Sequence, residues 1–289
     1  MCKVYEVVNS RIMELLESGT VPWRKTWNVG SNMPKNIISK KEYRGVNVFL
    51  LACSEFSSPY WMTFKQCVDK GGHVIKGSKS SPVIFWKWLD RKDTEAADTD
   101  AVSGKIPMLR FYNVFNLEQT EGIEPPATTE TINTFTPIER AEQIIASMPL
   151  RPEIKYGGNR ASYSPVLDYV RLPVQSSFAI PEEYYSTAFH ELSHATGHES
   201  RVGRKGVTET SYFGSHEYSK EELVAEMGAA FLCGHAGIEN TLENSAAYLA
   251  GWLKALKNDK TLLIHAAALA QKASDYILNI KPDVVEELS

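Results

Sequence analysis

Hydrophobic positions at the start of the chain repeat with the spacing of an amphipathic helix, with charged residues between them. The apolar residues on the predicted buried face are Val4, Val8, Ile12 and Leu15. Gly19 follows them and ends the pattern. This pattern differs from the uninterrupted apolar core of a signal peptide, and no apolar run in the chain has the length of a membrane span. We therefore expect a soluble, cytoplasmic protein.

Helix-like and strand-like patterns alternate through the first half of the chain. Residues 45–56 are mostly apolar, and a second helical stretch follows Thr63 and ends at a double-glycine turn. Residues 73–89 carry β-forming residues on both sides of a turn rich in Gly, Ser and Pro, and residues 108–117 are rich in such residues again. These patterns predict a small α/β domain.

Two polar segments interrupt the apolar patterns. Residues 91–105 are polar and acidic, and because strand-like sequence resumes after them, we interpret them as an exposed hairpin loop. Residues 121–137 are rich in Thr, Pro and Glu, which favours a domain boundary. We accordingly expect one domain over residues 1–125 and a second over residues 126–289.

The second domain is predicted to be mostly helical. Its first helix begins at Thr136, which is followed by a proline and has Glu139 in position for a capping box. Strand-like pieces near Ile154 and over 169–172 precede a helical pattern that runs from Pro181 almost to the end. The expected fold class is therefore α+β, with a small N-terminal α/β domain and a mostly helical C-terminal domain.

The overall charge of −4 is unevenly distributed along the chain. Residues 1–90 carry 13 Lys and Arg against 7 Asp and Glu, a balance of +6, which leaves 18 against 28, or −10, for the remainder. A basic first part favours an anionic partner such as nucleic acid. The cysteines form no CxxC pair, and we expect reduced thiols at Cys2, Cys53, Cys67 and Cys233.

The strongest chemical signal is the run His190-Glu191-Leu192-Ser193-His194. On a helix the two histidines lie one turn apart on one face, within reach of one zinc ion. Glu191 projects beside them, where it suits a general base acting on a water that zinc makes acidic. The run therefore predicts a catalytic zinc centre.

A catalytic zinc needs a third protein ligand. The metzincin pattern is excluded because it requires His at the position of Ser200. His198 would stand about 12 Å along the helix from His190, too far to share its metal, so we place it beside the ligands or at the helix end. A second helix then remains as the source of a gluzincin-like third ligand.

Three glutamates on this second helix lie among Ala and Gly residues that permit close approach of two helices. We expect Glu222 as the ligand and Glu226 as a hydrogen-bond acceptor for a ligand histidine, although these two roles are exchangeable. Glu221 best fits a solvated acidic face. His216 and Tyr218 are both candidates to stabilise a developing oxyanion, and the sequence does not choose between them.

Aromatic and basic residues interleave in the first domain. Cations that follow phosphates, beside rings that receive unpaired bases, are typical of single-stranded nucleic-acid binding. The opposing interpretation, core tryptophans and solvated lysines, is equally consistent with the composition. The candidate DNA-binding residues are Trp23, Arg24, Lys25, Trp27, Tyr43, Arg44, Asn47, Trp61, Lys65, Lys76, Lys79 and Lys87.

Both halves together resemble the ArdC family of antirestriction proteins, and the N-terminal half is also similar to TraC-type plasmid primases. The matching runs include ESGTVPWRKTW, KEYRGVNVFLL, GGHVIKGSKSSPVIFW, RFYNVFNLEQTEG, YYSTAFHELSHATGH and YSKEELVAEMGAAFL. The resemblance covers nearly the whole chain, and the order of the runs is more specific than the zinc pattern alone.

The resemblance implies a single-stranded-DNA-binding N-terminal domain and a zincin-like C-terminal metallopeptidase domain. Such proteins are carried by mobile genetic elements and protect incoming DNA from host restriction. The family's metal motif falls on His190, Glu191 and His194, with the third ligand in the run from Glu222 to Glu226. The acidic insert at 91–105 looks specific to this chain.

Two other functions compete with a zinc-dependent peptidase that acts on an unidentified protein substrate. One is a binding module that coats single-stranded DNA or blocks a restriction enzyme, with zinc in a purely structural role. The other is an accessory factor in conjugative DNA replication. An intact Glu191, which structural zinc does not require, favours catalysis.

Overall fold

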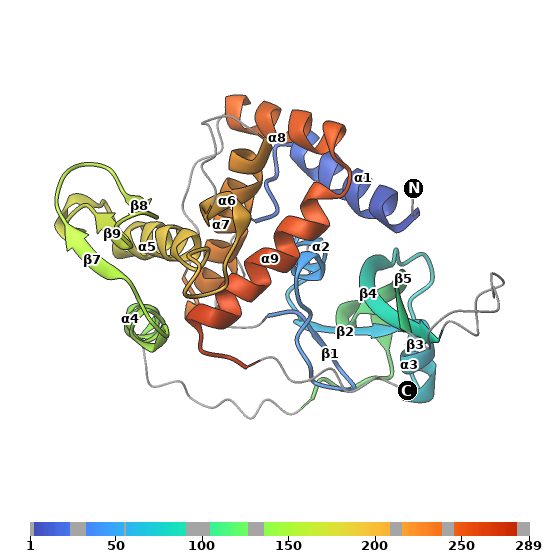
Figure 1. Cartoon of the computed structure of the whole chain (residues 1–289). Coiled ribbons are helices and arrows are strands. Elements are labelled where there is room, and N and C mark those ends of the chain that lie inside the picture. The colour runs from blue at the N-terminus through green and yellow to red at the C-terminus, as the bar shows by residue number, and fades with distance from the viewer. Residues whose placement is uncertain are drawn as a thin grey trace.

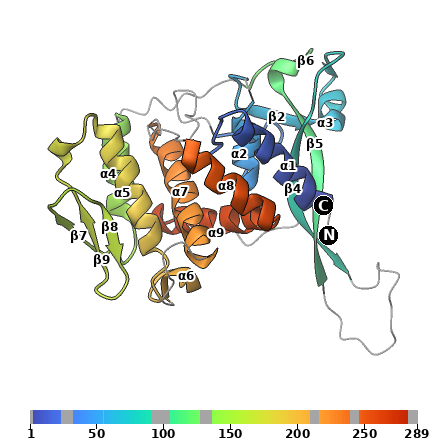
Figure 2. The ribbon, with the colours of Figure 1, turned by 90° about the horizontal axis from the view of Figure 1, so that it is seen from above.

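The computed structural model describes residues 3–23, 33–54, 56–90, 105–126, 136–208, 216–238 and 246–281. Its elements form three regions side by side (Figures 1 and 2): a small sheet with its helices at one end, a group of long helices in the middle, and a larger sheet at the other end. No helix in this described part combines the length and the apolar character needed to cross a membrane.

The N-terminal half contains short helices and a mixed sheet of four strands in the order β1-β2-β5-β4. Its helices are α1 (Lys3–Glu17), α2 (Val46–Ala52) and α3 (Phe64–Asp69). Its strands are β1 (Lys35–Asn36), β2 (Tyr60–Thr63), β3 (His73–Val74), β4 (Ser81–Asp90), β5 (Lys105–Asn116) and β6 (Thr120–Glu121), where β3 pairs with β6 in a separate ribbon. The small α/β arrangement predicted for this half is confirmed.

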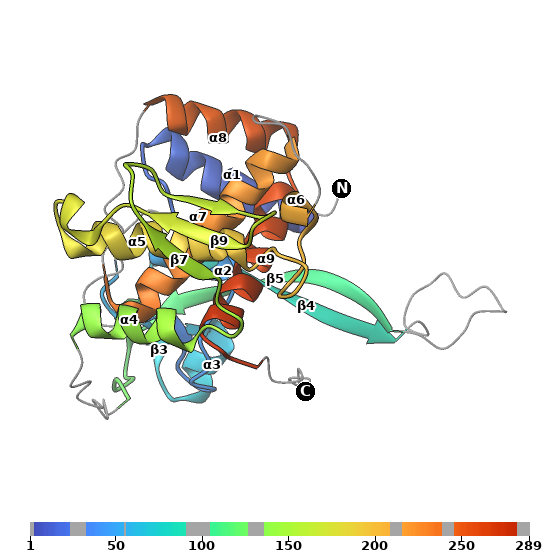
Figure 3. The ribbon, with the colours of Figure 1, turned by 60° about the vertical axis from the view of Figure 1, so that its left-hand side comes forward.

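The longest ladder joins β4 and β5, which pair antiparallel from Ser81 opposite Val114 to Asp90 opposite Lys105. The two strands form an arm that leaves the body of the molecule (Figure 3). The predicted hairpin strands are therefore present, whereas the acidic insert between them lies outside the described residues.

The C-terminal half consists of long helices and a small sheet. Its helices are α4 (Pro137–Ser147), α5 (Pro181–Ala195), α6 (Lys205–Thr208), α7 (His216–Ala236), α8 (Ala246–Asn258) and α9 (Leu262–Ile277). Its strands β7 (Glu153–Tyr156), β8 (Ser162–Ser164) and β9 (Tyr169–Leu172) lie in the order β7-β9-β8. The mostly helical character is confirmed, while the edge strand β8 is an element that periodicity did not reveal, since its three residues are too short for a pattern.

Capping explains where two of the helices begin. Thr136 accepts a hydrogen bond from the Glu139 backbone, and the Glu139 carboxylate accepts one from the Thr136 backbone. Thr63 and Gln66 form the same reciprocal pair at the start of α3. These two helix starts agree with their sequence signals.

In α1, however, Leu16 rather than Leu15 completes the buried face, because the four-residue steps from Val4 to Ile12 continue to position 16.

One hydrophobic core joins the two halves. It includes Val8 and Ile12 of α1, Phe49 of α2, and apolar residues of α7, α8 and α9. Phe49 stacks on Phe231 of α7 with ring centroids 4.9 Å apart. A second core lies between the small sheet, α4, α5 and α7. Three cysteines, Cys53, Cys67 and Cys233, are buried as thiols.

Candidate metal centre

Helix α5 carries the predicted histidines and packs between the small sheet and α7 (Figure 2). Pro181 occupies its first turn, where a missing N–H costs no hydrogen bond. Phe189 and Leu192 face the core and are fully buried. This packing fixes the rotation of α5 and turns His190 and His194 toward α7.

Close approach of α7 to α5 depends on Gly228. A Cβ atom at this position would lie 2.6 Å from the Ser193 Oγ, so a side chain larger than hydrogen would separate the helices. The small residues around the glutamates therefore have the role expected of them, and they bring Glu222 opposite the histidines.

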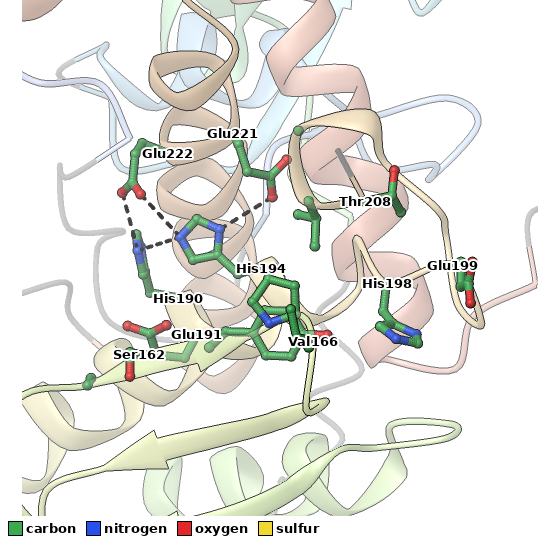
Figure 4. Close-up of a pocket in the computed structure, with 15 residues that line it drawn as sticks. Ser162, Val166, His190, Glu191, His194, His198, Glu199, Thr208, Glu221 and Glu222 are labelled. Carbon is green, nitrogen blue, oxygen red and sulfur yellow. Dashed lines mark hydrogen bonds and ion pairs between the residues drawn. The ribbon is translucent and has the colours of Figure 1, made fainter. Parts of the chain in front are cut away.

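The three potential ligands converge on one point (Figure 4). The Nε2 atoms of His190 and His194 are 3.1 Å apart, and the Glu222 carboxylate oxygens lie 3.7 Å from His190 Nε2 and 3.6 Å from His194 Nε2. One ligand atom from each residue lies within 4.8 Å of the others. A tetrahedral ion with bonds of about 2.0–2.1 Å separates its ligands by roughly 3.3–3.4 Å, so this set fits a metal ion without rearrangement.

Glu221 supports His194 from behind. Its Oε1 lies 3.3 Å from His194 Nδ1, so the imidazole can donate there and direct its Nε2 lone pair toward the metal position. Arg204 donates to both carboxylate oxygens, from Nε at 3.0 Å and from a terminal nitrogen at 2.5 Å. The expectation of a solvated Glu221 was wrong, because the side chain is only 7% exposed and pairs with a buried guanidinium.

Charges in this network shift two ionisation equilibria. Burial alone would raise the pKa of Glu221, but hydrogen bonds from His194 and Arg204 hold it below its usual value. Burial likewise disfavours the charged form of His194, yet Glu221, Glu222 and Glu191 together raise its pKa. A region this rich in negative charge attracts a cation.

Glu226 contacts a residue of the N-terminal half. Its Oε2 accepts a hydrogen bond from the Trp23 indole at 3.0 Å. The carboxylate on His194 is therefore Glu221, one helical position before Glu222, and Glu226 connects α7 to the N-terminal half. Sequence spacing did not distinguish these glutamates, because all three lie within two turns of one helix.

Glu191 faces the same cleft as the metal ligands. The cleft has a volume of about 870 Å³, and its wall includes Ser162 and Tyr163 of β8, Val166 and His198. Glu191 is 8% exposed. Burial raises its pKa to about 7, with a further increase from Glu222 and opposing effects from His194 and the Tyr163 backbone.

His198 lines the cleft away from the ligand group (Figure 4), and its Nδ1 lies 2.8 Å from the Ser200 hydroxyl. Within the described residues it does not belong to the cluster that a metal ion would need. The side chains of His216 and Tyr218, the two oxyanion candidates, lie outside the described part.

The structure corrects the three described aromatic DNA-binding candidates. Trp23, Trp61 and Tyr43 are 1%, 2% and 6% exposed, so their rings belong to the core and present no face to a base. The Asn47 amide is also buried and pairs with both backbone groups of Ile84, at 2.7 Å each, where it covers the edge of β4.

Several of the basic DNA-binding candidates, in contrast, are exposed in the structure. Arg44 forms an ion pair with Asp275 of α9. Exposed side chains that remain available to phosphates are Lys65, Lys76 and Lys79. Candidates outside the described residues or side chains are Arg24, Lys25, Trp27 and Lys87.

Two histidines and a glutamate from neighbouring helices, backed by a small sheet, define a zincin-like domain. Residues 139–269 match the family model of a zincin-like metallopeptidase. Residues 2–115 match the N-terminal domain of the anti-restriction factor ArdC. The chain belongs to the ArdC family of antirestriction proteins.

Relatives agree with this assignment. The crystal structure of the antirestriction protein ArdC from plasmid R388 in its metal-free form has 34% identity and a TM-score of 0.77, and the match covers 96% of this chain and 98% of that one. The Mn(II)-bound structure has 32% identity and a TM-score of 0.76, over 97% and 98% of the two chains. An uncharacterized protein of Sinorhizobium fredii is 32% identical over 95% of this chain and 91% of its own length.

Two proteins named DNA primase TraC from Escherichia coli are also similar, each with 36% identity over 98% of this chain. The chain spans only 28% and 20% of their lengths. The likeness therefore concerns one part of those larger proteins.

Proposed function

We propose that this protein is a metal-dependent peptidase with a single-stranded-DNA-binding N-terminal half, which protects the DNA of a mobile element from restriction in the host cytoplasm. The observation that carries the peptidase is the placement of Glu191 in one cleft with His190, His194 and Glu222. Structural metal sites are closed by protein ligands, whereas this set has three ligands and opens into a cleft.

Zinc is the metal that we propose, because two imidazoles and one carboxylate are a common catalytic zinc set. A divalent ion held by His190, His194 and Glu222 would act as a Lewis acid that lowers the pKa of a water and polarises the scissile carbonyl. The Mn(II)-bound relative supports a divalent ion, and carboxylate and imidazole ligands suit both metals.

Glu191 would then perform the proton transfers. Its carboxylate removes a proton from the attacking water and can return it to the amine of the departing peptide.

Strand β8 offers a way to hold an extended peptide. It is the edge strand of its sheet, and its residues Ser162 and Tyr163 line the cleft. An extended segment could add alongside it through backbone hydrogen bonds. Such binding depends little on the side chains of the bound segment.

The first test is to substitute Glu191→Gln and measure metal content, peptidase activity on unfolded protein, and survival of unmodified plasmid DNA in a restricting host. We expect stoichiometric zinc in both proteins and a loss of at least about 100-fold in peptidase rate in the variant. Glu199→Gln is a matched control, because Glu199 is an exposed carboxylate on the wall of the same cleft.

The alternative is a binding module whose metal serves the fold alone. Equal antirestriction by Glu191→Gln and the parent protein would favour it and contradict the catalytic proposal. A protein that binds no stoichiometric metal after reconstitution would contradict both. A role in conjugative replication rests on the TraC similarity, and primer synthesis on a single-stranded template would have to be observed to support it.

A further inference from the structure

The middle of the β4–β5 ladder carries two partly exposed aromatic rings and an arginine on one face. In the ladder, Phe85 lies opposite Arg110 and diagonal to Tyr112, so the three side chains project from the same face. Phe85 and Tyr112 are each 42% exposed, and Arg110 is exposed as well. We call these three residues the arm platform.

This surface departs from the usual pattern of an antiparallel sheet, in which one face is buried and the other is polar. On the opposite face, Ile84 and Leu109 are buried in the core that joins the halves, while Phe111 is 37% exposed. On the platform face, Val83 is also buried, near the sheet centre. Tyr112, the cross-strand partner of Val83, and Phe85, the next residue on this face, nevertheless remain partly open to solvent.

The rings are held in place by one another. Tyr112 meets Phe85 edge to face with centroids 5.9 Å apart, and Phe85 lies 6.2 Å from the ring of Tyr43, which is buried. The row thus runs from the core to the surface. A ring anchored on one edge loses little conformational entropy when a flat partner covers it.

We propose that the arm platform binds unpaired bases of single-stranded nucleic acid, with Phe85 and Tyr112 as stacking rings and Arg110 as the cation for the adjacent phosphate. This inference rests on the DNA-binding part of the proposed function and assigns its location. The chemistry favours this occupant because every base has a flat apolar face with a phosphate near it. The basic balance of residues 1–90 agrees with an anionic partner.

The platform replaces the buried rings as the base-contacting surface. The interleaving of basic and aromatic residues points mainly to tryptophans, but the accessible rings of the platform are a phenylalanine and a tyrosine. Their signal in the sequence is the alternation in RFYNV, which puts Arg110 and Tyr112 on one face of a strand.

The test compares the full-length parent with the double variant Phe85→Leu, Tyr112→Leu in binding to a fluorescein-labelled oligothymidylate and to an abasic strand of equal length. Leucine keeps an apolar side chain and removes the ring. We expect the double variant to lose roughly 100-fold in affinity for the oligothymidylate, about tenfold for each ring, and to bind the abasic strand as the parent does.

Three further variants separate stacking from other effects. Phe64→Leu is the matched control, since Phe64 is 59% exposed on α3 of the same half and should bind like the parent. Tyr112→Phe keeps the ring and should also keep the affinity. Arg110→Gln should reduce the slope of log affinity against log salt by about 0.7.

Different outcomes would contradict the arm platform and the DNA-binding function. A parent protein that binds neither strand would contradict the DNA-binding function itself. A parent that binds, with a double variant of equal affinity, would overturn the platform and leave the function intact. A double variant that binds normally but changes from dimer to monomer in sedimentation would assign the surface to a second copy of the chain and also overturn the inference.

Discussion

The carboxylate of Glu221 has two partners, His194 and Arg204. One carboxylate oxygen faces the imidazole of His194, while both oxygens accept hydrogen bonds from Arg204, which is itself 4% exposed. Arg204 also donates to the Ser193 carbonyl at 2.7 Å, which connects the loop after α5 back to the helix. The orientation of the His194 imidazole therefore depends on Arg204, which acts through Glu221.

We predict that Glu221→Gln lowers zinc affinity by about 10- to 100-fold, because an amide supports the ligand histidine less well than a carboxylate and leaves Arg204 without its charge partner. Competition with a chromogenic chelator measures this affinity. Glu199→Gln, in the same cleft but exposed, should change it little. Equal affinities of the two variants would show that Glu221 only stabilises the fold, and thermal unfolding without metal would confirm that reading.

Residues of the site differ in how far the sequence predicts them. His190, Glu191 and His194 follow from spacing within one helix, which is local information. Glu222 needed the assumption that a second helix approaches the first. Glu221 escaped prediction because its partner Arg204 comes from a loop, and a contact between a loop and a helix leaves no periodic signal. The sequence also does not predict which aromatic rings are exposed, because contacts between distant segments leave no periodic signal.

Among the elements, the β8–β9 hairpin depends on one buried cation. Arg201, with its side chain 1% exposed, forms an ion pair with Asp168 in the turn and also donates to the Tyr163 hydroxyl at 3.1 Å and the Ala195 carbonyl at 2.7 Å. These bonds attach the hairpin to the end of α5. The wall of the cleft is thereby fixed relative to the helix that carries the histidines.

We predict that Asp168→Asn destabilises the protein by about 1 kcal/mol at neutral pH, a value reduced for partial exposure of this carboxylate. Asn tolerates the positive φ of 46° at this position, so the change isolates the charge. The hydrogen bond from Arg201 is the main cause that lowers the pKa of Asp168 below its usual 3.8, against the smaller opposing effect of burial.

The sign of the pH dependence follows from this shift. A depressed pKa in the folded state contributes stability above the unfolded value, and this contribution is lost as the pH falls through the folded value. The difference between Asp168→Asn and the parent should therefore be constant at neutral pH and shrink below about pH 4. Urea unfolding across pH measures it, with Glu153→Gln, at an exposed ion pair, as the control; a difference that grows in acid would refute the assignment.

At the scale of the whole molecule, the family models match two separate parts of the chain, yet the core does not respect that division. Helix α1 packs against α8, and Trp23 contacts both Trp252 of α8 and Glu226 of α7. Composition predicts a boundary near residue 125, but composition along a chain carries no information on which distant helices share a core.

We predict that the protein unfolds in one cooperative transition, with coincident midpoints from far-ultraviolet circular dichroism and tryptophan fluorescence. A fragment of residues 1–125 should expose the apolar face of α1 and bind a hydrophobic dye, because its partners on α7, α8 and α9 are missing. Two separate transitions, or a compact fragment that binds no dye, would show that the halves are independent.

The pairing of α1 with α8 also affects how the protein is made. The ribosome synthesises α1 long before α8 and α9, so the apolar face of α1 stays uncovered until these partners have been made. A nascent chain with an uncovered helix is prone to aggregation and is a natural client for chaperones. A stop codon before α8 would therefore yield an insoluble product, even though all the residues assigned to the cleft and to the arm would already have been synthesised.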